Sequence, residues 1–220
     1  MENIKKQVRT FFKQQADLFC DEFYLEDNIQ DLIKQKTGLD GIKEEVKNCN
    51  QCPALRRRKN IVFGAGNPEA DLMMIDMISH EDEEAEGTPL VGEAGKLFDK
   101  ILAAINLSRD DIYLTKIIKC PISNNRQPSH QEIVNCLKYL YRQIDIIKPK
   151  LMVGLGLKTA KALINQNQPL EKIHGHVYKF HAIDFITTYH PKALIKNQSF
   201  KKPAWDDFKK IRELYLKHRN

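Results

Sequence analysis

From residue 60 onward, short apolar runs alternate with longer stretches of helical periodicity. The apolar runs have the length of β-strands and end at glycines or polar turns; they are IVFGAG (61–66), LMMIDM (72–77), IYLTKII (112–118), LMVGLG (151–156) and FITTY (185–189). The stretches between them predict helices over residues 95–106, 130–147 and 157–166. Strands that alternate with helices build a mainly parallel sheet covered on both faces, so the pattern predicts an α/β fold.

The first 37 residues follow a helical pattern of their own. Apolar residues recur there near a 3.6-residue period, namely Ile4, Val8, Phe11, Phe12 and Leu18. The breaker TGLDG ends this pattern, and GIKEEVKNC (41–49) predicts a short second helix. The chain is therefore predicted to carry a helical appendage over residues 1–40, which packs on the domain or on another protein. The α/β domain is predicted over residues 41–220.

Composition narrows the classes of protein. A chain of 220 residues suits one sizeable domain. Its formal net charge of +6 permits a polyanionic partner such as DNA, and a lysine-rich solvated surface is the alternative. No apolar run approaches the roughly 20 residues that cross a bilayer, and the N-terminus lacks an apolar signal core. The protein is therefore expected to be cytoplasmic, without a membrane partner.

The cysteines carry the strongest chemical signal. In a reducing compartment, 5 cysteines favour metal ligation or thiol chemistry over disulfides. Cys49 and Cys52 form CNQC, Cys120 follows a predicted strand, and Cys136 lies on a predicted helix. These four thiolates suit a tetrahedral zinc site or an iron–sulfur cluster, and a metal-free thiol pair is the alternative. Cys20 lies on an apolar helix face, which predicts core packing.

The segment PLVGEAG (89–95) places Gly92 and Gly95 at the entrance of a predicted helix. Glycines at such a position let a ligand approach the backbone closely, and the unpaired N–H groups of a helix N-terminus attract anions. The segment is therefore predicted to line a binding site for an anionic group.

Several segments resemble the iron–sulfur (family 4) uracil-DNA glycosylases. They are CNQCPALRRR, GTPLVGEAGKLFDKIL, KCPISNNRQPSHQEIVNC, IKPKLMVGLG and HPKALIKN, and the resemblance covers roughly residues 45–215. It implies a four-stranded parallel sheet between helices, in a three-layer α/β/α sandwich. It also implies a [4Fe–4S] cluster on Cys49, Cys52, Cys120 and Cys136. The family works in base-excision DNA repair by flipping uracil out of DNA and hydrolysing its N-glycosidic bond.

The resemblance also assigns roles to residues near the C-terminus and beside the cysteines. His190, in TTYHPKAL, matches the histidine that serves the uracil oxyanion. Lys192 and Lys196 flank it, and Arg56 lies in the basic stretch LRRRK; all three are expected either to contact DNA phosphates or to be solvated. Gly92 is expected to line the nucleotide site.

The expected pocket departs from the family at its principal polar groups. Aligned without gaps, the family's catalytic glutamate falls at Met77, whose thioether cannot orient a water molecule. The stacking phenylalanine becomes Leu90, and the uracil-reading asparagine becomes Lys116, which offers donors only. Two glycines of the same motif become Asp76 and His80.

The acidic stretch HEDEEAEG (80–87) follows these positions and is predicted to be a solvated loop. A local realignment would instead bring His80 or one of the acidic residues 81–83 toward the pocket.

Three functional hypotheses follow. The first is a hydrolase, a DNA N-glycosylase that acts weakly on uracil or prefers another base. The second is a catalytically silent iron–sulfur protein that binds DNA or a partner through the same scaffold. The third is covalent capture of a base-free sugar by Lys116 or His80, although the arginine-rich insertion of cross-linking relatives is absent.

Overall fold

The computed structural model of the protein describes residues 38–52, 58–122, 126–165 and 167–219. The chain divides into two units, residues 1–37 and 38–220, and all described residues belong to the second. The helix predicted near the N-terminus, together with Cys20, lies outside the described residues. No helix in the described part of the chain is long and apolar enough to cross a membrane.

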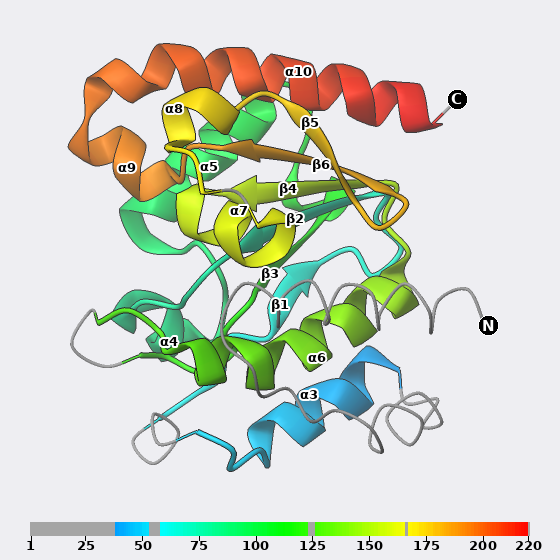
Figure 1. Ribbon diagram of the computed structural model, residues 1–220, viewed down its shortest axis with the longest axis vertical. Helices are drawn as coiled ribbons and strands as arrows, with labels where there is room; N and C mark the ends of the chain where they lie inside the picture. The colour runs from blue at the N-terminus through cyan, green and yellow to red at the C-terminus, as the bar shows by residue number, and fades with distance from the viewer. Residues whose placement is uncertain (1–37, 53–57, 123–125, 166, 220) are drawn as a thin grey trace. The chain divides into compact units, whose positions relative to one another are not determined.

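The second unit is built on a six-stranded sheet with the order β1-β3-β2-β4-β6-β5, which Figure 1 shows from bottom to top. The strands are β1 (Gly64–Gly66), β2 (Leu72–Asp76), β3 (Ile112–Lys116), β4 (Leu151–Leu155), β5 (Val177–Phe180) and β6 (Ile183–Thr188). The inner strands β3, β2, β4 and β6 are parallel to one another. The edge strands β1 and β5 are antiparallel to their neighbours.

The predicted α/β class is confirmed, and four of the five predicted strands are the parallel centre of the sheet. The fifth predicted run, 61–66, contributes the antiparallel edge strand β1. The strand count is six rather than the four that the resemblance implied, because two antiparallel edge strands, β1 and β5, flank the four parallel strands. Of these two, β5 was not predicted from its sequence VYKF. This edge strand is largely solvent-facing, so it lacks the continuous apolar run that marks the buried inner strands.

Helices surround this sheet and connect its strands. The α-helices are α3 (Leu39–Lys47), α4 (Glu81–Glu86), α5 (Gly92–Ala104), α6 (His130–Ile147), α7 (Leu157–Ile164), α8 (Leu170–Ile173), α9 (Pro191–Lys196) and α10 (Lys201–Arg219). Two 3-10 turns, η2 (Arg109–Asp111) and η4 (Gln198–Phe200), precede β3 and α10.

Two apolar clusters occupy the two faces of the sheet, because successive residues of a strand point to opposite faces. Met73, Ile75 and Met77 belong to the cluster formed with α6 and α7. Leu72 and Met74 belong to the cluster formed with α5 and α10. Helices therefore cover both faces, and the expected three-layer α/β/α arrangement is confirmed.

The acidic stretch 80–87 is a helix rather than the solvated loop that was predicted. It forms α4, which begins after His80 and ends at Gly87 in the left-handed conformation. Acidic residues in its first turn interact favourably with the positive end of the helix dipole. One of them, Glu83, is buried. The prediction was wrong because the whole stretch is acidic, and nothing local marks one of its carboxylates as a buried ion-pair partner.

Candidate active site

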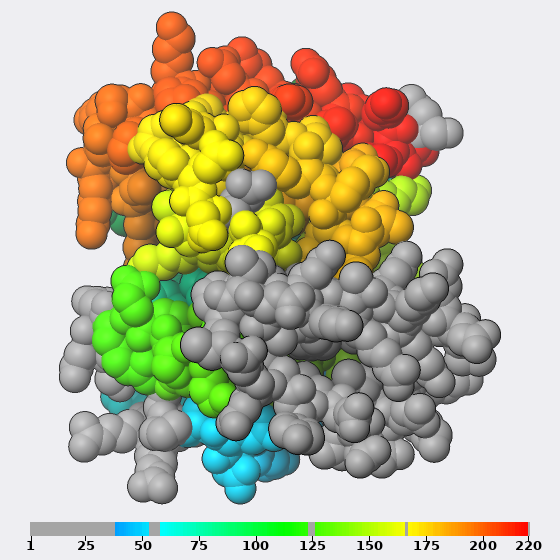
Figure 2. All heavy atoms as spheres, viewed as in Figure 1, coloured from blue at the N-terminus to red at the C-terminus, as the bar shows by residue number. Residues whose placement is uncertain are grey.

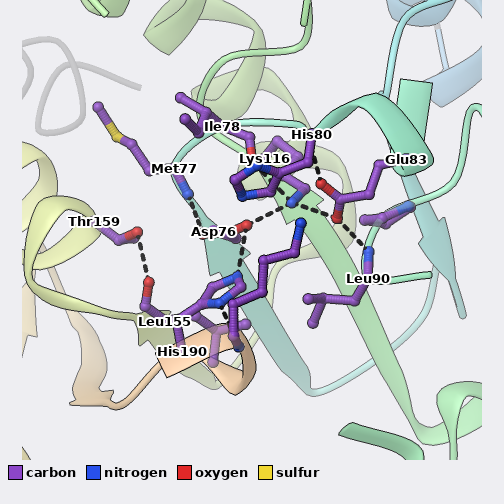
Figure 3. A network of polar contacts seen from close by, with 12 residues as sticks. Asp76, Met77, Ile78, His80, Glu83, Leu90, Lys116, Leu155, Thr159 and His190 are labelled. Carbon is purple, nitrogen blue, oxygen red and sulfur yellow. Dashed lines mark hydrogen bonds and ion pairs between the residues drawn. The ribbon is translucent and has the colours of Figure 1, made fainter. Parts of the chain in front are cut away.

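Charged side chains gather where the parallel strands end. Asp76 is the last residue of β2, Lys116 is the last residue of β3, and the parallel register places them opposite each other. His190 follows β6 and precedes the first turn of α9. The carboxyl ends of parallel strands share one edge of a sheet, which is where α/β proteins bind ligands. Figure 3 shows Asp76 between the other two side chains.

Lys116 is the centre of this group. Its side chain is fully buried, and its Nζ lies 2.5 Å from Asp76 Oδ2, 2.7 Å from Glu83 Oε1 and 3.0 Å from the Ile78 carbonyl oxygen. An ammonium group has three N–H donors, and all of them are bound here. Burial lowers the pKa of Lys116, but the carboxylates of Asp76 and Glu83 outweigh burial and raise it. Lys116 is therefore a charged, fully coordinated cation.

Asp76 is the shared acceptor between Lys116 and His190. Its Oδ2 accepts from Lys116 and lies 3.1 Å from His190 Nε2, while its Oδ1 accepts the Met77 backbone N–H at 2.7 Å. Burial raises the pKa of Asp76, but His190 and Lys116 more than offset burial and hold the pKa well below its usual range. The carboxylate therefore stays ionised although it is buried.

The hydrogen bonds of His190 assign its tautomer. Nδ1 accepts the backbone N–H of Lys192 at 3.1 Å, so the proton of the neutral ring is on Nε2. That N–H points to Asp76 Oδ2. The donor that the family resemblance assigns to the uracil oxyanion is thus already bound to a carboxylate.

Glu83 connects α4 to the loop that precedes α5. Its Oε1 accepts the Leu90 backbone N–H at 2.5 Å as well as the Lys116 ammonium, and its Oε2 accepts the His80 backbone N–H at 2.8 Å. These three bonds satisfy a carboxylate that would otherwise be buried without partners. The ungapped alignment gave Glu83 no assigned role, and only the alternative local realignment pointed to this segment.

Arg109 binds the backbone carbonyl groups of the same loop, the one that precedes α5. Its guanidinium donates to the carbonyl oxygens of Pro89 and Leu90 at 3.1 and 2.5 Å, and to Asp99 Oδ1 at 2.7 Å. Leu90 has φ of 50°, in the left-handed region that is unfavourable for a branched residue. A Cβ at Gly95 would lie 2.1 Å from the Leu90 carbonyl oxygen, so glycine is required there. The close backbone approach expected at PLVGEAG is therefore made, at Gly95, by the protein's own chain.

The structure brings together most of the predicted pocket residues. His80 and Leu90 lie beside Lys116 and His190, and burial, followed by the charge of Lys192, lowers the pKa of His80. Met77 does not join them: it is buried in the cluster under α6 and α7, and its side chain points away from Asp76 in Figure 3.

The remaining predicted residues lie around this group. Gly92 begins α5 with φ of 63°, and a Cβ there would lie 3.2 Å from Asp82 Oδ2. Lys192 is half-buried, with its Nζ 3.6 Å from Asp82 Oδ1, and Lys196 is exposed in the last turn of α9. Arg56 lies outside the described residues.

The cysteines form a second group, around α3 and α6. Cys52, Cys120 and Cys136 are buried and Cys49 is partly exposed. Burial raises the pKa of the Cys120 thiol to about 12, and the neighbouring Cys136 and Cys49 contribute. Burial likewise raises the pKa of Cys136 to about 11, with Cys52 and Cys49 contributing. The Cys120 and Cys136 thiols thus interact with each other and with other cysteines of the set, and Cys120 packs in one apolar cluster with Cys49.

Two nitrogen donors point at these sulfurs. Arg58 Nη1 lies 3.3 Å from Cys120 Sγ, and Asn135 Nδ2 lies 3.5 Å from Cys52 Sγ. Within the described ranges, no group of three or more His, Cys, Asp or Glu side chains is arranged closely enough to hold a metal ion.

Comparisons with known proteins identify the family to which this fold belongs. The model of the uracil DNA glycosylase superfamily matches residues 63–209, so the chain belongs to that superfamily.

Within the superfamily, the chain is similar to the type-4 uracil-DNA glycosylases. The chain is 40% identical over 188 residues to that of Sulfurisphaera tokodaii, covering 81% of this chain and 86% of the relative. Those of Saccharolobus solfataricus and Archaeoglobus fulgidus are 38% and 35% identical over 185 residues, covering 80% of this chain and 86% and 93% of theirs. The resemblance to family 4 is confirmed.

Proposed function

We propose that this protein is a DNA-binding member of the superfamily that excises uracil much more slowly than its type-4 relatives. The observation that carries the proposal is the ion network of Lys116, Asp76, Glu83 and His190. In that network the polar groups of the pocket bind one another. A DNA-repair role is supported by the names of the relatives.

Each chemical requirement of uracil excision meets an obstacle in this network. A donor near the uracil oxyanion stabilises the departing base, but the His190 Nε2–H is directed at Asp76. Reading the base edge needs free donors and acceptors, but Lys116 has all three N–H groups bound. Positioning a water needs an acceptor at position 77, where Met77 contributes a buried thioether.

The network also bears on the two other hypotheses. Covalent capture of a sugar by Lys116 requires a neutral amine, and the raised pKa keeps Lys116 protonated. A silent DNA-binding protein is the second candidate, because complete pairing of the pocket groups is compatible with no excision at all. Residual activity that depends on His190 separates the slow enzyme from the silent protein.

We further propose that Cys49, Cys52, Cys120 and Cys136 hold a [4Fe–4S] cluster. In a [4Fe–4S] cluster each cysteine thiolate binds a different iron, so the four sulfur atoms need not surround a single ion. Thiols that interact with one another across the set, with Arg58 and Asn135 donating toward two sulfurs, fit such a group. When bound, the cluster would link the segment after α3 to the end of β3 and to α6. The cytoplasmic location and a protein contact of residues 1–40 stay predictions from the sequence.

The proposed function is tested by single-turnover excision of uracil from labelled single- and double-stranded DNA. We expect DNA binding that weakens as salt increases, and excision at least about a hundredfold slower than by the Sulfurisphaera tokodaii relative under the same conditions. His190→Ala should remove the remaining activity. Rapid excision by the wild-type protein that persists in His190→Ala would contradict the proposal and place the active site elsewhere.

The cluster is tested separately, by iron and sulfide content after anaerobic purification. Replacing Cys49, Cys52, Cys120 or Cys136 with serine should lower the iron content and the broad visible absorption of the protein, because each substitution removes one thiolate. Cys20→Ser is the matched control and should change neither. Stoichiometric zinc without sulfide would show that the site is a zinc site instead.

A further inference from the structure

An exposed indole lies on α10, the helix that follows His190 and α9 along the chain. Trp205 is the only tryptophan of the chain and is 39% exposed, on the second turn of α10. Lys201 and Lys202 precede it by four and three residues, so they lie on the same side of the helix, and both are exposed. An aromatic ring flanked by cations offers a stacking face and a positive charge to one ligand.

This surface is continuous with the residues that follow His190. The chain runs from His190 through α9 and η4 directly into α10, and Lys196 ends α9. Phe200 of η4 stacks on Tyr189, with ring centroids 4.8 Å apart, and Tyr189 immediately precedes His190. Figure 1 shows α9 beside the start of α10, and Figure 2 shows both segments, in orange, at one corner of this face. We call Lys196, Lys201, Lys202 and Trp205 the Trp205 surface.

The cations of the Trp205 surface outnumber the carboxylate beside them. Asp206 is bound by Lys209 at 2.7 Å, and its pKa is lowered first by that bond and also by the charge of Lys202. Lys201 Nζ lies 3.5 Å from a neutral acceptor, Gln198 Oε1. A net positive charge therefore remains around one exposed aromatic face.

We propose that the Trp205 surface binds a single-stranded nucleic acid segment that continues from the active site. The lysines contact its phosphates, and the indole stacks on an unpaired base. The combination favours a single strand, because a duplex offers phosphates but keeps its base faces stacked. An acidic protein would match the lysines but would leave the indole without a planar partner. The proposal rests on the proposed function only in that the protein binds DNA.

The single tryptophan makes the proposal directly measurable. Titration with a short oligothymidylate that contains no uracil should quench the intrinsic fluorescence of Trp205, whereas a blunt duplex should quench it little. Trp205→Ala should weaken oligothymidylate binding by about 5-fold to 150-fold, which corresponds to the range for one base stacked on an aromatic side chain. Trp205→Phe retains a ring and should keep most of the affinity. Lys202→Ala should flatten the log–log salt dependence by about 0.7.

Matched controls lie on the same helix. Leu216 is 45% exposed on the same side of α10, eleven residues further on, and Leu216→Ala should leave the affinity unchanged. If labelled DNA binds by anisotropy but Trp205 fluorescence and Trp205→Ala affinity do not change, this inference is wrong while the proposed function stands. Equal quenching by polyglutamate would overturn it in favour of an acidic protein partner. Absence of DNA binding at any ionic strength would overturn both proposals.

Discussion

Replacing Lys116 with methionine is expected to lower the free energy of unfolding by about 3–5 kcal/mol, the range for removing one partner of a buried ion pair. Methionine fills a similar volume, so the loss comes from charge rather than from a cavity. Asp76 and Glu83 are both buried, and the Lys116 ammonium bonds a carboxylate oxygen of each. Without the ammonium, the two carboxylates face each other in a region of low dielectric constant.

The effect is measured by urea denaturation of the wild type and the variant. Lys150→Met is the matched control, because Lys150 is 49% exposed and its Nζ lies 3.3 Å from Asp71 Oδ1 in a surface pair. Such pairs contribute less than about 1 kcal/mol. The double variant Asp76→Gly with Lys116→Asn should regain part of the stability, since it removes one of the two carboxylates, while Glu83 keeps only its bonds from the backbone N–H groups of His80 and Leu90. A loss as small as that of Lys150→Met would show that the network is not a buried charge pair.

Restoring four of the five altered pocket positions, with His80 left unchanged, should raise the rate of uracil excision by at least about a hundredfold. Met77→Glu supplies a water-positioning carboxylate if its side chain leaves the apolar cluster that Met77 occupies and turns toward the pocket. Leu90→Phe supplies a stacking ring, and Lys116→Asn a group with donor and acceptor. Asp76→Gly removes the carboxylate that occupies His190 Nε2. The substitution Met77→Glu alone should leave the rate low, because His190 and Lys116 stay bound to Asp76.

The rate of the fourfold variant is measured in single-turnover assays on a uracil-containing oligonucleotide, with its thymine counterpart as the control substrate. Adding His190→Ala to the fourfold variant should remove the gain, because the oxyanion then has no donor. If the fourfold variant folds and binds DNA but gains no activity, groups other than these five limit the chemistry.

The inner sheet was predictable because its strands are buried on both faces. LMMID and LMVGL read as continuous apolar runs, which is how strands of a parallel sheet appear in sequence. Strand β5 lacks such a signal because it is largely solvent-facing, and α8 lacks one because a helix of 4 residues is too short to show a period. The α/β class therefore followed from the sequence, and the edges of the sheet did not.

The site was predictable in position but not in its bonding. Asp76 and Lys116 each end an apolar strand, so a charge at equivalent places of neighbouring strands was visible in the sequence. Their pairing was not, because it depends on which strands are adjacent. The role of Glu83 was harder to predict than that of Asp76 or Lys116, because Glu81 and Glu84 beside it are the same residue type. Only the position at which α4 begins determines which of these carboxylates turns inward.

The buried pair of Asp76 and Lys116 also constrains how this protein can evolve. Neutralising Lys116 first leaves Asp76 and Glu83 facing each other without their shared cation, so that intermediate loses much of its stability before any pocket function changes. Selection would remove such an intermediate, because natural domains are stable by only about 5–15 kcal/mol. Neutralising Asp76 first leaves Lys116 paired with Glu83, so stepwise return to a uracil-reading pocket is expected to change Asp76 before Lys116.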